Sequence, residues 1–517
     1  MPDVLSAVEL SADVLIIGGG MAGAWAAVAA RQTGAEVVLV DKGYCGTSGV
    51  TAAAGPGHWW VAPEEREAAV DARHLSTLGL ADKSWMHRIL DTTWQWLPGL
   101  APWYHFPRDP SGRTHYAPMR GPEYMGALRQ RLDQAGVIVL DHSPALELLL
   151  HRDGSAAGAR GWRIRDRRPW QIRAAGVILA AGGCAFKSHL LGSANNTGDG
   201  YLMGAEAGVA LSGMEFSREY CIAQARTSMT RSMIYSFGRY QDASGHEVGG
   251  DHTALAEALL RGPVYCQLER TPDDIRQQLP EISPNVQLLF DRAGLKPYNE
   301  PFEVTLRAEG TVRGTGGLLI ADNDCQTRVP GLYAVGDCAS RVPVAGANTG
   351  GGAVNSAWAL SSGIWAGQAV ARLARHQGRR LDEAVQPVGE AGLRPRGQRK
   401  TGAPAEITQR VQDEMLPLDK NYFRTGEKLQ RSLAALDTLW DEVREQPGAD
   451  PVRSREAAAL AATARWCYRA ALERKESRGL HQRSDLPHSR DELAHSMTVG
   501  GLDRVWVDTR ATEELPA

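Results

Sequence analysis

The chain contains 517 residues, of which 43% are hydrophobic and 23% are charged, and its formal net charge at pH 7 is −3. This balance gives no indication of binding to nucleic acid or to an anionic membrane surface. No run of about 18 apolar residues is present to span a membrane. The length predicts two to four structural units at roughly 100–200 residues each.

The seven cysteines are scattered, and none belongs to a C-x-x-C pair. This spacing argues against a metal site in the chain, whether a structural zinc or an iron–sulfur cluster. The N-terminal stretch shows neither the basic region nor the apolar region of an export signal. Free thiols without such a signal predict a cytoplasmic protein.

Residues 13–43, DVLIIGGGMAGAWAAVAARQTGAEVVLVDKG, predict a strand, a glycine turn, a helix and a second strand. The strands are the apolar runs 14–17 and 37–40, which suit a parallel sheet that is buried on both faces. The turn contains the pattern G-x-G-x-x-G, formed by Gly18, Gly20 and Gly23.

There is a physical reason for glycine at each position of this pattern. The first permits a tight turn, the second lets a pyrophosphate approach the backbone, and the third packs the helix on the strand. Asp41 ends the second strand, where its carboxylate can bind an adenosine ribose. This context favours dinucleotide binding over an ordinary glycine-rich turn, but it does not choose between NAD and FAD.

Two later strands favour FAD. VILAAGG (177–183) is an apolar strand that ends in Gly-Gly, and VPGLYAVGD (329–337) is a strand that ends in an acid. An acid at that place can bind the ribityl chain of a flavin, which NAD lacks. Each piece alone could be an ordinary buried strand, but their order after the glycine pattern predicts FAD.

The rest of the chain predicts a mixture of helices, strands and loops. The expected elements are a helical region at 63–100, short strands up to residue 183, an irregular region of loops and a few helices at 214–306, a long small-residue helix at about 355–375, a linker at 385–404 and a charged helical region at 405–475.

Four further segments carry a resemblance to a known family: NNTGDGYLMGAEAG (195–208), GLYAVGD (331–337), GANTGGGAVNS (346–356) and RKESRGLHQRSDLP (474–487). With them the chain resembles the flavoprotein subunit superfamily of succinate dehydrogenase and fumarate reductase, which includes L-aspartate oxidase and adenylylsulfate reductase. The resemblance implies an α/β fold, with a Rossmann-like FAD-binding domain, an inserted α+β capping domain and a C-terminal helical domain. The expected boundaries are 1–213 and 309–384 for the FAD-binding domain, 214–308 for the capping domain, 385–404 for the linker and 405–517 for the helical domain.

The stretch GTSGVTAAAG, residues 46–55, has almost no side-chain bulk. The resemblance implies that this loop runs against the flavin ring, where small residues and backbone N–H groups are needed. Respiratory members have Ser-His-Thr here and link the His covalently to FAD, whereas Gly49 offers no nucleophile. The resemblance and the plain interpretation of Gly49 as a turn glycine both predict non-covalent FAD.

The same resemblance implies a wider set of FAD contacts beyond the glycine pattern and Asp41. The set is Lys42, Ser48, Thr51, Gly55, Gly182, Gly183, Asp199, Gly336, Asp337, Asn355 and Ser356. Two further residues, Arg478 and His481, could lie near the flavin or could form a structural ion pair with Asp485 or Glu476.

The chain departs from the superfamily at two places. The dicarboxylate enzymes have H-x-x-x-G-G and G-A-N-R, whose His and Arg hold substrate carboxylates, a task that suits a bidentate Arg. Here the matching stretches are TVRGTGG (311–317) and GANTGGG. Val312 stands near the His position, Thr349 replaces the Arg, and Arg313 is one residue out of register. Succinate and fumarate are therefore not expected as substrates.

The resemblance implies that a proton-transfer arginine lies in the capping domain, where the corresponding stretch is TRSMIYSFGRYQDASGHEV (230–248). The candidates there are Arg231, Arg239, Tyr235 and Tyr240, and the alternative for each is an ordinary surface or structural residue. After the flavin loop, His58 is a further catalytic candidate, and with Trp59 and Trp60 it could wall the substrate pocket or belong to the core.

The leading hypothesis is an FAD-dependent oxidoreductase that transfers hydride or electrons between flavin and a small organic substrate. The chain has no second G-x-G-x-x-G and no cluster motif, so the electrons need a separate acceptor or donor. The likeness of DKGYCGTSGV (41–50) to adenylylsulfate reductase implies a ferredoxin-like iron–sulfur protein as electron-transfer partner, and oligomer formation is left open. The alternatives are a flavin oxidase of the aspartate-oxidase type that uses O2 and a non-catalytic flavin-binding subunit for electron transfer.

Overall fold

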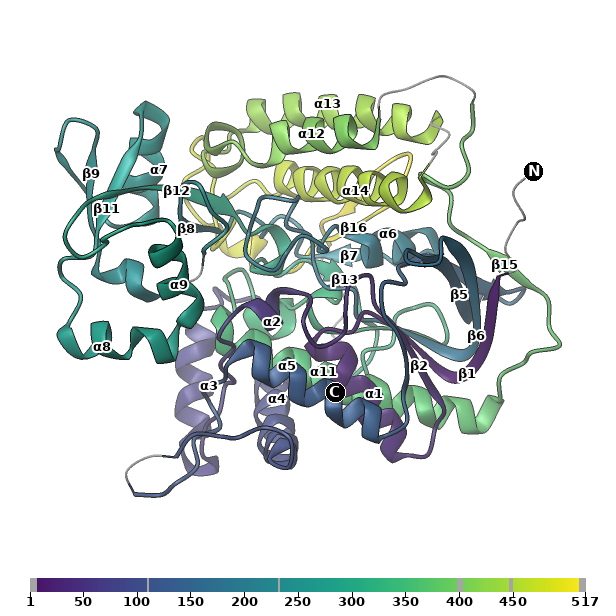
Figure 1. Cartoon of the computed structure of the whole chain (residues 1–517). Helices are drawn as coiled ribbons and strands as arrows, with labels where there is room; N and C mark the ends of the chain where they lie inside the picture. The colour runs from purple at the N-terminus through teal and green to yellow at the C-terminus, as the bar shows by residue number, and fades with distance from the viewer. Residues whose placement is uncertain (1–6, 109–110, 231–232, 398–402, 446–449, 511–517) are drawn as a thin grey trace.

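The structure is a computed structural model of the whole chain, and it describes residues 7–108, 111–230, 233–397, 403–445 and 450–510. A large sheet with flanking helices forms one side of the molecule, and a smaller sheet with helices projects on the other side (Figure 1). Three long helices of the C-terminal part lie along the top of this view. The architecture is therefore α/β, with a Rossmann-like domain, an inserted α+β domain and a C-terminal helical domain.

The large sheet has eight strands in the order β15-β4-β5-β6-β1-β2-β3, with β14 beside β6. Strands β14, β6, β1, β2 and β3 run parallel, whereas β5, β4 and β15 continue from β6 in antiparallel fashion. The strands are β1 (Val8–Ile17), β2 (Val37–Val40), β3 (Ile138–Leu140), β4 (Ala145–His151), β5 (Ala156–Arg163), β6 (Arg168–Leu179), β14 (Leu332–Ala334) and β15 (Val385–Pro387).

The centre of the parallel part is buried, because residues 14–17, 37–40, 176–179 and 332–334 are apolar, whereas the edge strand β3 is partly exposed. Residues 14–17 of β1 pair with β2 on one side and with residues 176–179 of β6 on the other. The chain returns much later, when β14 pairs with residues 177–179. These registers bring the carboxyl ends of four strands to one edge, where ligands bind in sheets of this kind.

Two helices pack closely against each other beside this sheet. α1 (Met21–Gln32) follows β1, and α11 (Gly351–Gln377) lies along α1. A Cβ at Gly363 or at Gly367 would lie 2.3 Å from a carbonyl oxygen of α1, so only glycine permits this spacing. On this pair, α5 (Gly121–Gln134) packs against α1, α4 (Lys83–Trp96) packs against α11, and α3 (Arg66–Leu75) packs against α4.

The inserted domain has its own antiparallel sheet, in the order β10-β9-β11-β12-β8, and its own apolar core. Buried side chains such as Leu255, Val264 and Phe290 form this core. Its elements are β8 (Tyr220–Gln224), β9 (Arg239–Asp242), β10 (Glu247–Val248), α7 (His252–Arg261), β11 (Val264–Gln267), α8 (Asp273–Ile282), α9 (Pro284–Arg292) and β12 (Phe302–Ala308).

The C-terminal part consists of α12 (Pro404–Met415), α13 (Gly426–Glu445) and α14 (Pro451–Glu473). α14 packs on α6 (Asp199–Glu206) of the Rossmann-like domain. A small sheet in the order β13-β7-β16-β17 pairs the end of the chain with the same domain. Its strands are β7 (Leu211–Ser212), β13 (Gly317–Leu318), β16 (Thr498–Gly500) and β17 (Trp506–Asp508).

Three expectations differ from the structure. The long helix begins at Gly351 rather than near Asn355, although glycine has a poor helix propensity. The expected linker at 385–404 begins with β15, an edge strand where a proline is tolerated. The irregular region at 214–306 contains a complete sheet whose strands are two to seven residues long, too short for a clear alternation.

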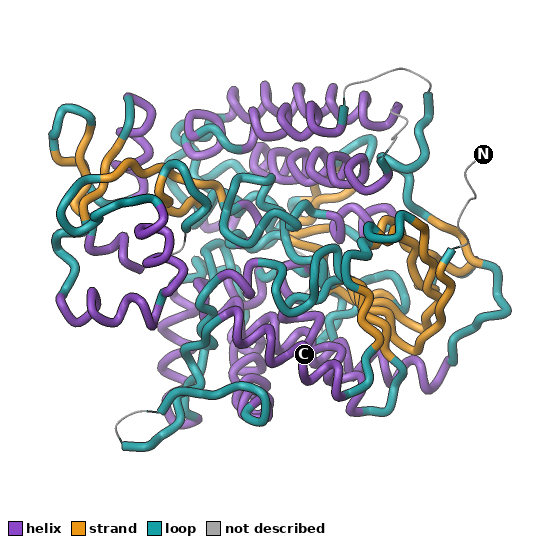
Figure 2. Tube along the Cα trace, in the orientation of Figure 1, coloured by secondary structure: helices purple, strands orange, loops and turns teal. Residues whose placement is uncertain are grey.

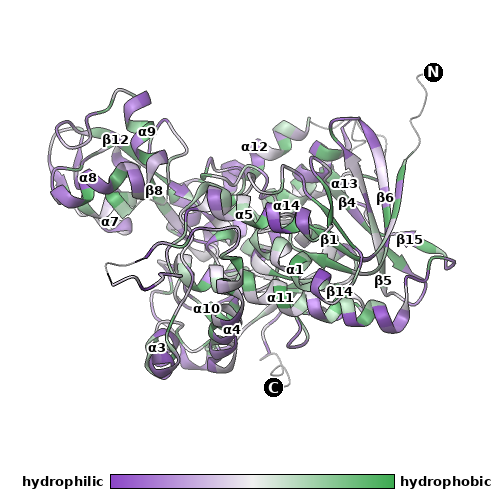
Figure 3. Ribbon diagram, turned by 60° about the horizontal axis from the view of Figure 1, so that its bottom comes forward, coloured by the Kyte–Doolittle hydropathy of each residue, from purple (hydrophilic) through white to green (hydrophobic). Residues whose placement is uncertain are grey.

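Strands are concentrated in the large sheet and in the inserted domain, as Figure 2 shows. In Figure 3 the ribbon around β1 is mostly hydrophobic, while α3 and α8 present hydrophilic colours. Among the helices that the structure describes, none has the length and apolar character needed to cross a membrane.

Candidate functional site

A deep pocket opens at the carboxyl ends of β1, β2 and β6 and reaches α6 and the segment after β14. Its empty space, mouth included, is about 940 Å³. We call it the cofactor pocket. The residues expected around FAD that line it are Gly18, Gly20, Asp41, Lys42, Ser48, Thr51, Gly182, Asp199, Gly336 and Asp337.

The glycine turn after β1 has the backbone geometry that only glycine allows. Gly18 has a φ of +113°, and a Cβ there would lie 2.2 Å from the carbonyl oxygen of Ala180. A Cβ at Gly23 would lie 1.9 Å from the carbonyl oxygen of Gly18, so α1 packs directly on the turn. At Gly20 the same space is open. The start of α1 therefore offers N–H groups and room for a phosphate.

Asp41 is buried at the wall of the pocket, and three donors hold its carboxylate. Oδ2 accepts from the N–H of Gly19 at 2.6 Å, while Oδ1 accepts from the N–H of Gly43 at 2.7 Å and from Ser48 Oγ at 3.1 Å. An ionised carboxylate has roughly four acceptor sites. Asp41 can therefore accept one further hydroxyl from a ligand without giving up its present bonds.

Lys42 joins the pocket to the C-terminal helical domain. Its Nζ lies 2.6 Å from Asp199 Oδ2, 2.7 Å from Thr197 Oγ1 and 2.8 Å from Glu456 Oε1 on α14. The other oxygen of Glu456 pairs with Lys187 at 2.8 Å. Burial acts to lower the pKa of Lys42, but the two carboxylates outweigh it and the pKa is raised. Lys42 therefore stays charged at the pocket wall.

Two features of the pocket fit FAD. Asp199 Oδ1 is buried and, among the described residues, has no hydrogen-bond partner, so it offers an acceptor to a ligand. Gly49 precedes α2 (Val50–Ala53), has a φ of +90° and leaves open space where a Cβ would be. A planar ring can therefore approach this backbone closely, and Gly49 has no side chain that could form a covalent link.

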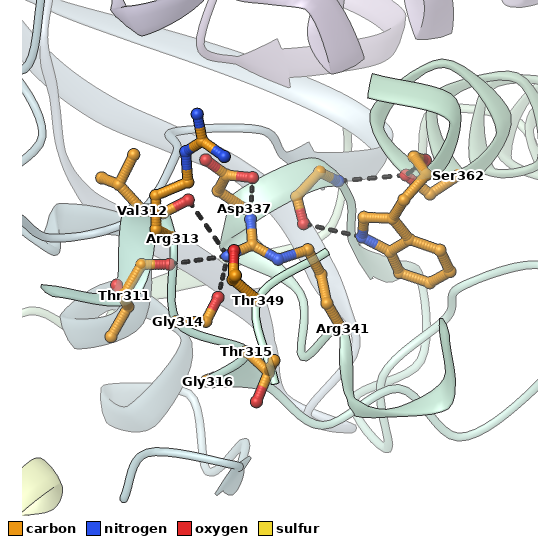
Figure 4. Close-up of polar contacts among 12 residues, drawn as sticks. Thr311, Val312, Arg313, Gly314, Thr315, Gly316, Asp337, Arg341, Thr349 and Ser362 are labelled. Carbon is orange, nitrogen blue, oxygen red and sulfur yellow. Dashed lines mark hydrogen bonds and ion pairs between the residues drawn. The ribbon is translucent and has the colours of Figure 1, made fainter. Parts of the chain in front are cut away.

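Figure 4 shows a buried cation that the sequence analysis did not single out. The Arg341 guanidinium binds the carboxylate of Asp337 and the carbonyl oxygen of Gly314. It also donates to the carbonyl oxygens of Thr311 at 2.8 Å and of Val312 at 3.2 Å. Arg341 thereby fixes the loop after β12 against a residue of the cofactor pocket.

Five of the expected FAD contacts lie elsewhere than the lining of the pocket. Gly183 packs against the loop after β12. Gly23 packs α1 on the turn, and Ser356 is buried within α11. Gly55 lines a smaller cleft between the start of α5 and α9 of the inserted domain. Asn355 Oδ1 is buried and has no hydrogen-bond partner in the described part of the chain. The FAD contacts of these five residues remain predictions.

The catalytic candidates of the inserted domain lie within its own sheet. Arg239 Nε pairs with Glu269 Oε1 at 2.8 Å, and the buried Tyr240 hydroxyl donates to the carbonyl oxygen of Tyr235 at 2.6 Å. Arg231 lies outside the described residues. The structure brings neither Arg239 nor Tyr240 to the cofactor pocket, so their catalytic roles gain no geometric support and remain predictions.

His58 lies in an aromatic core beside α1 and α5. Its Nε2 is 3.3 Å from the hydroxyl of Tyr124, which accepts a hydrogen bond from Trp25 Nε1 at 2.7 Å. Burial lowers the pKa of His58 to about 3, so the ring is neutral. Trp60 stacks on Trp94 with ring centroids 4.3 Å apart. This geometry agrees with the core alternative for His58 and Trp60.

A cluster of charged groups lies where the chain enters the inserted domain before β8 and leaves it after β12. We call Glu219, Glu309 and Arg313 the hinge cluster. The N–H of Glu309 donates to the carbonyl oxygen of Glu219 at 2.8 Å, and Arg313 Nε lies 3.5 Å from the Glu309 carboxylate. Burial, assisted by the charge of Glu309, raises the pKa of Glu219 to about 7. Arg313 is thus paired with an acid of the protein itself.

The segment after α14 is held by ion pairs. Arg478 binds Glu476 through two contacts, from Nε at 2.8 Å and from Nη2 at 3.0 Å, whereas Asp485 pairs with Arg483. His481 is fully buried, and this burial holds its pKa well below the usual range. The ion-pair alternative for Arg478 is therefore the one that the structure contains, with Glu476 as partner.

Known protein families match most of the chain. Residues 13–354 match the family described as FAD binding domain, and residues 412–512 match the family described as the C-terminal part of the fumarate reductase flavoprotein. This chain belongs to the succinate dehydrogenase and fumarate reductase flavoprotein superfamily. It is an FAD-dependent oxidoreductase, as the sequence analysis predicts.

The relatives span nearly the whole chain. A CoM/CoB fumarate reductase subunit from Methanothermobacter marburgensis is 27% identical, and the alignment covers 94% of this chain and 96% of the relative. L-aspartate oxidase of Mycobacterium leprae is 28% identical, with 95% of each covered. An E. coli quinol fumarate reductase has the same fold, with a TM-score of 0.79, 22% identity and 99% of both chains covered. Adenylylsulfate reductase of Archaeoglobus fulgidus also shares it, with a TM-score of 0.75, 18% identity and coverage of 99% and 97%.

Three residues of interest escaped the sequence analysis: Glu219, Arg341 and Glu456. Glu219 and Glu456 act through partners that are distant in sequence, and Arg341 joins the nearby Asp337 to carbonyl oxygens of an earlier loop. The spacing of four residues between Asp337 and Arg341 is the one local signal among them. In the described part of the chain no group of three His, Cys, Asp or Glu side chains could hold a metal ion.

Proposed function

We propose that this enzyme transfers hydride or electrons between non-covalently bound FAD and a small organic substrate other than succinate or fumarate, in the cytoplasm. The observation that carries the proposal is the cofactor pocket, where Gly49 leaves the backbone open and offers no nucleophile. In this proposal Asp41 and Asp199 accept hydrogen bonds from the cofactor, and the turn at Gly18 and Gly20 binds its phosphates.

Bound FAD supplies the redox chemistry. The residues of the chain then bind it, orient it and hold charge at fixed places. Lys42 keeps a positive charge at the pocket wall, and Arg341 holds Asp337 and the neighbouring loop in one position. Such prior ordering lowers the cost of reorganisation when the substrate reacts.

Acid precipitation of the purified yellow protein tests the mode of FAD binding. We expect one FAD per chain, and all of it in the supernatant. Yellow colour retained in the washed pellet would show a covalent link and would overturn this part of the proposal.

The choice of substrate rests on the two departures at Val312 and Thr349. Arg313, which could have replaced the missing anchor, is engaged by Glu309 at 3.5 Å. We expect little reduction of fumarate with a reduced viologen dye and little oxidation of succinate. Robust fumarate reduction would contradict the proposal and would mean that another cation serves the dicarboxylate.

For the electron partner we propose a separate ferredoxin-like iron–sulfur protein. The relative from Methanothermobacter is named as one subunit of a fumarate reductase, which supports an assembly of this kind. Stopped-flow mixing of the substrate-reduced enzyme with air-saturated buffer should show slow reoxidation that ferredoxin or a one-electron dye accelerates.

The second candidate is a flavin oxidase, favoured by the similarity to L-aspartate oxidase. Reoxidation by air at a rate that matches turnover would establish it and would remove the need for a partner. A non-catalytic flavin-binding subunit remains the third candidate. It predicts that no substrate bleaches the flavin in an anaerobic titration.

A further inference from the structure

Helix α14 of the C-terminal domain holds both ends of α6, the helix whose first residue lines the cofactor pocket. At the far end of α6, the buried side chain of Glu206 binds Arg455 of α14, with Oε1 2.8 Å from Nη1. At the near end, a Cβ at Gly198 would lie 2.4 Å from Thr463 Oγ1, so α14 lies directly on the start of α6 (Figure 1). Two segments that are far apart in the sequence are thus fixed to each other at the wall of the pocket.

Glu456 of α14 reaches the same wall through Lys42. The ammonium of a lysine has three donors. In Lys42 they are taken by three acceptors: Glu456 Oε1 at 2.8 Å, Thr197 Oγ1 at 2.7 Å and Asp199 Oδ2 at 2.6 Å. Burial acts to raise the pKa of Glu456, but Lys42 and Lys187 outweigh it and the pKa is lowered. Glu456 is therefore a charged acceptor that holds one donor of Lys42.

This arrangement leaves one carboxylate oxygen of Asp199 to a ligand. Oδ2 accepts from Lys42 and also from Thr197 Oγ1 at 2.8 Å. Oδ1 is buried and has no hydrogen-bond partner in the part of the chain that the structure describes. Removal of Glu456 would release one donor of Lys42, beside a carboxylate that Lys42 already binds. That donor would then compete with a ligand for Oδ1.

We propose that Glu456 is a positioning residue for the cofactor: by engaging Lys42, it keeps Asp199 Oδ1 available to a hydroxyl of FAD. This inference rests on the FAD site of the proposed function. Glu456 does not itself line the cofactor pocket, as far as the described residues define that lining. The helical domain thus helps to retain FAD without touching it. Docking of α14 and binding of FAD stabilise each other, because both favour the same positions of Lys42 and Asp199.

Release of FAD from the diluted holoenzyme, followed by the rise in flavin fluorescence, tests this inference. Glu456→Met should accelerate release about tenfold, the lower end for the loss of a hydrogen bond to a charged group. Glu456→Gln keeps an acceptor for Lys42 and should release FAD at nearly the wild-type rate. The matched control is Glu473→Met at the other end of α14, where the partner is Arg469, and its release rate should be unchanged.

A double variant shows whether the effect passes through Lys42. In Lys42→Met/Glu456→Met, FAD should leave at the rate of Lys42→Met alone, because Glu456 acts only through Lys42. This comparison also covers the case in which Glu456→Met does not fold, since the double variant removes both charges of the pair together.

The release rates need neither a substrate nor an electron partner, so a failure of the proposed redox function would leave them interpretable. Three outcomes would each overturn the inference. They are equal release from wild type and Glu456→Met, release from Glu456→Gln as fast as from Glu456→Met, and faster release from the double variant than from Lys42→Met.

Discussion

The cofactor pocket and the hinge cluster hold their charges in different ways. In the pocket, Asp41 is held by the N–H groups of Gly19 and Gly43, which belong to the same β-turn-α-β unit. In the hinge cluster, two carboxylates meet from the ends of different strands, and the pKa of Glu219 rises to about 7. Backbone donors close in sequence thus create a fixed acceptor, whereas side chains from distant segments create a group that changes charge near neutral pH.

This difference indicates where in the fold the selectivity for a substrate can vary. A cofactor site built from glycine conformations and main-chain N–H groups tolerates little change, because a Cβ at Gly18 would meet a carbonyl oxygen at 2.2 Å. A site built from side chains on separate elements can change one residue at a time. Val312 and Thr349 are differences of this second kind.

The largest effect is expected at Arg341, which links the two regions. Arg341→Met would leave Asp337 and three carbonyl oxygens without their buried cation. Breaking a buried ion pair from one side costs about 3–5 kcal/mol of unfolding free energy, measured by urea denaturation. Arg372→Met is the control, since its pair with Asp324 is exposed and is worth about 0–1 kcal/mol. Similar losses for both variants would show that the loop does not depend on Arg341.

The hinge cluster should make stability depend on pH. Because the pKa of Glu219 is raised from its ordinary 4.5 to about 7, the folded protein binds a proton that the unfolded chain releases between these values. The free energy of unfolding should therefore fall as pH rises through this window, by up to roughly 3 kcal/mol. Glu219→Gln should flatten that slope, while Glu300→Gln on the exposed surface should not. An unchanged slope in Glu219→Gln would assign the pH dependence to other groups.

Substitution of Asp41 tests how the cofactor pocket binds FAD. Asp41→Ala removes a charged acceptor that we expect to bind a ribose hydroxyl, at a cost of about 1.5–3 kcal/mol, or about ten- to a hundredfold in FAD affinity. Fluorescence titration of the apoprotein with FAD measures it. Asp41→Asn keeps one acceptor and should lose less, and the distant exposed Asp153→Ala should lose nothing. Unchanged affinity in Asp41→Ala would mean that the adenosine is held elsewhere.

The smallest effect is expected at Tyr240. Tyr240→Phe removes one buried hydrogen bond to the carbonyl oxygen of Tyr235, worth about 1 kcal/mol of stability. Since the structure keeps this hydroxyl within the inserted domain, kcat should not change. A large fall in kcat with unchanged stability would instead restore Tyr240 as a proton-transfer residue.

The sequence predicts the cofactor pocket better than it predicts contacts between distant segments, and the reason is physical. The turn at Gly18 and the acid at Asp41 are separated by one helix and one strand. Their spacing in the sequence therefore predicts that they lie close together in the fold. The contacts of Arg73 with Thr349, and of Lys42 with Glu456, join residues hundreds of positions apart. Such contacts depend on how whole helices and strands pack, and no local periodicity of the sequence predicts them. The short strands of the inserted domain escaped detection for the related reason that two to seven residues give too few alternations.

The late return of the chain to the large sheet has a consequence for biosynthesis. β14 completes the edge of β6, and α11 covers α1, yet both are translated after the whole inserted domain. Until α11 has left the ribosome, a nascent chain exposes an unpaired strand edge and an apolar helix face, both of which invite association with other chains. The inserted domain is synthesised before that point, and Tyr422 is the one buried member of its core that follows later. The cofactor pocket is therefore completed late, by segments that are synthesised after the inserted domain.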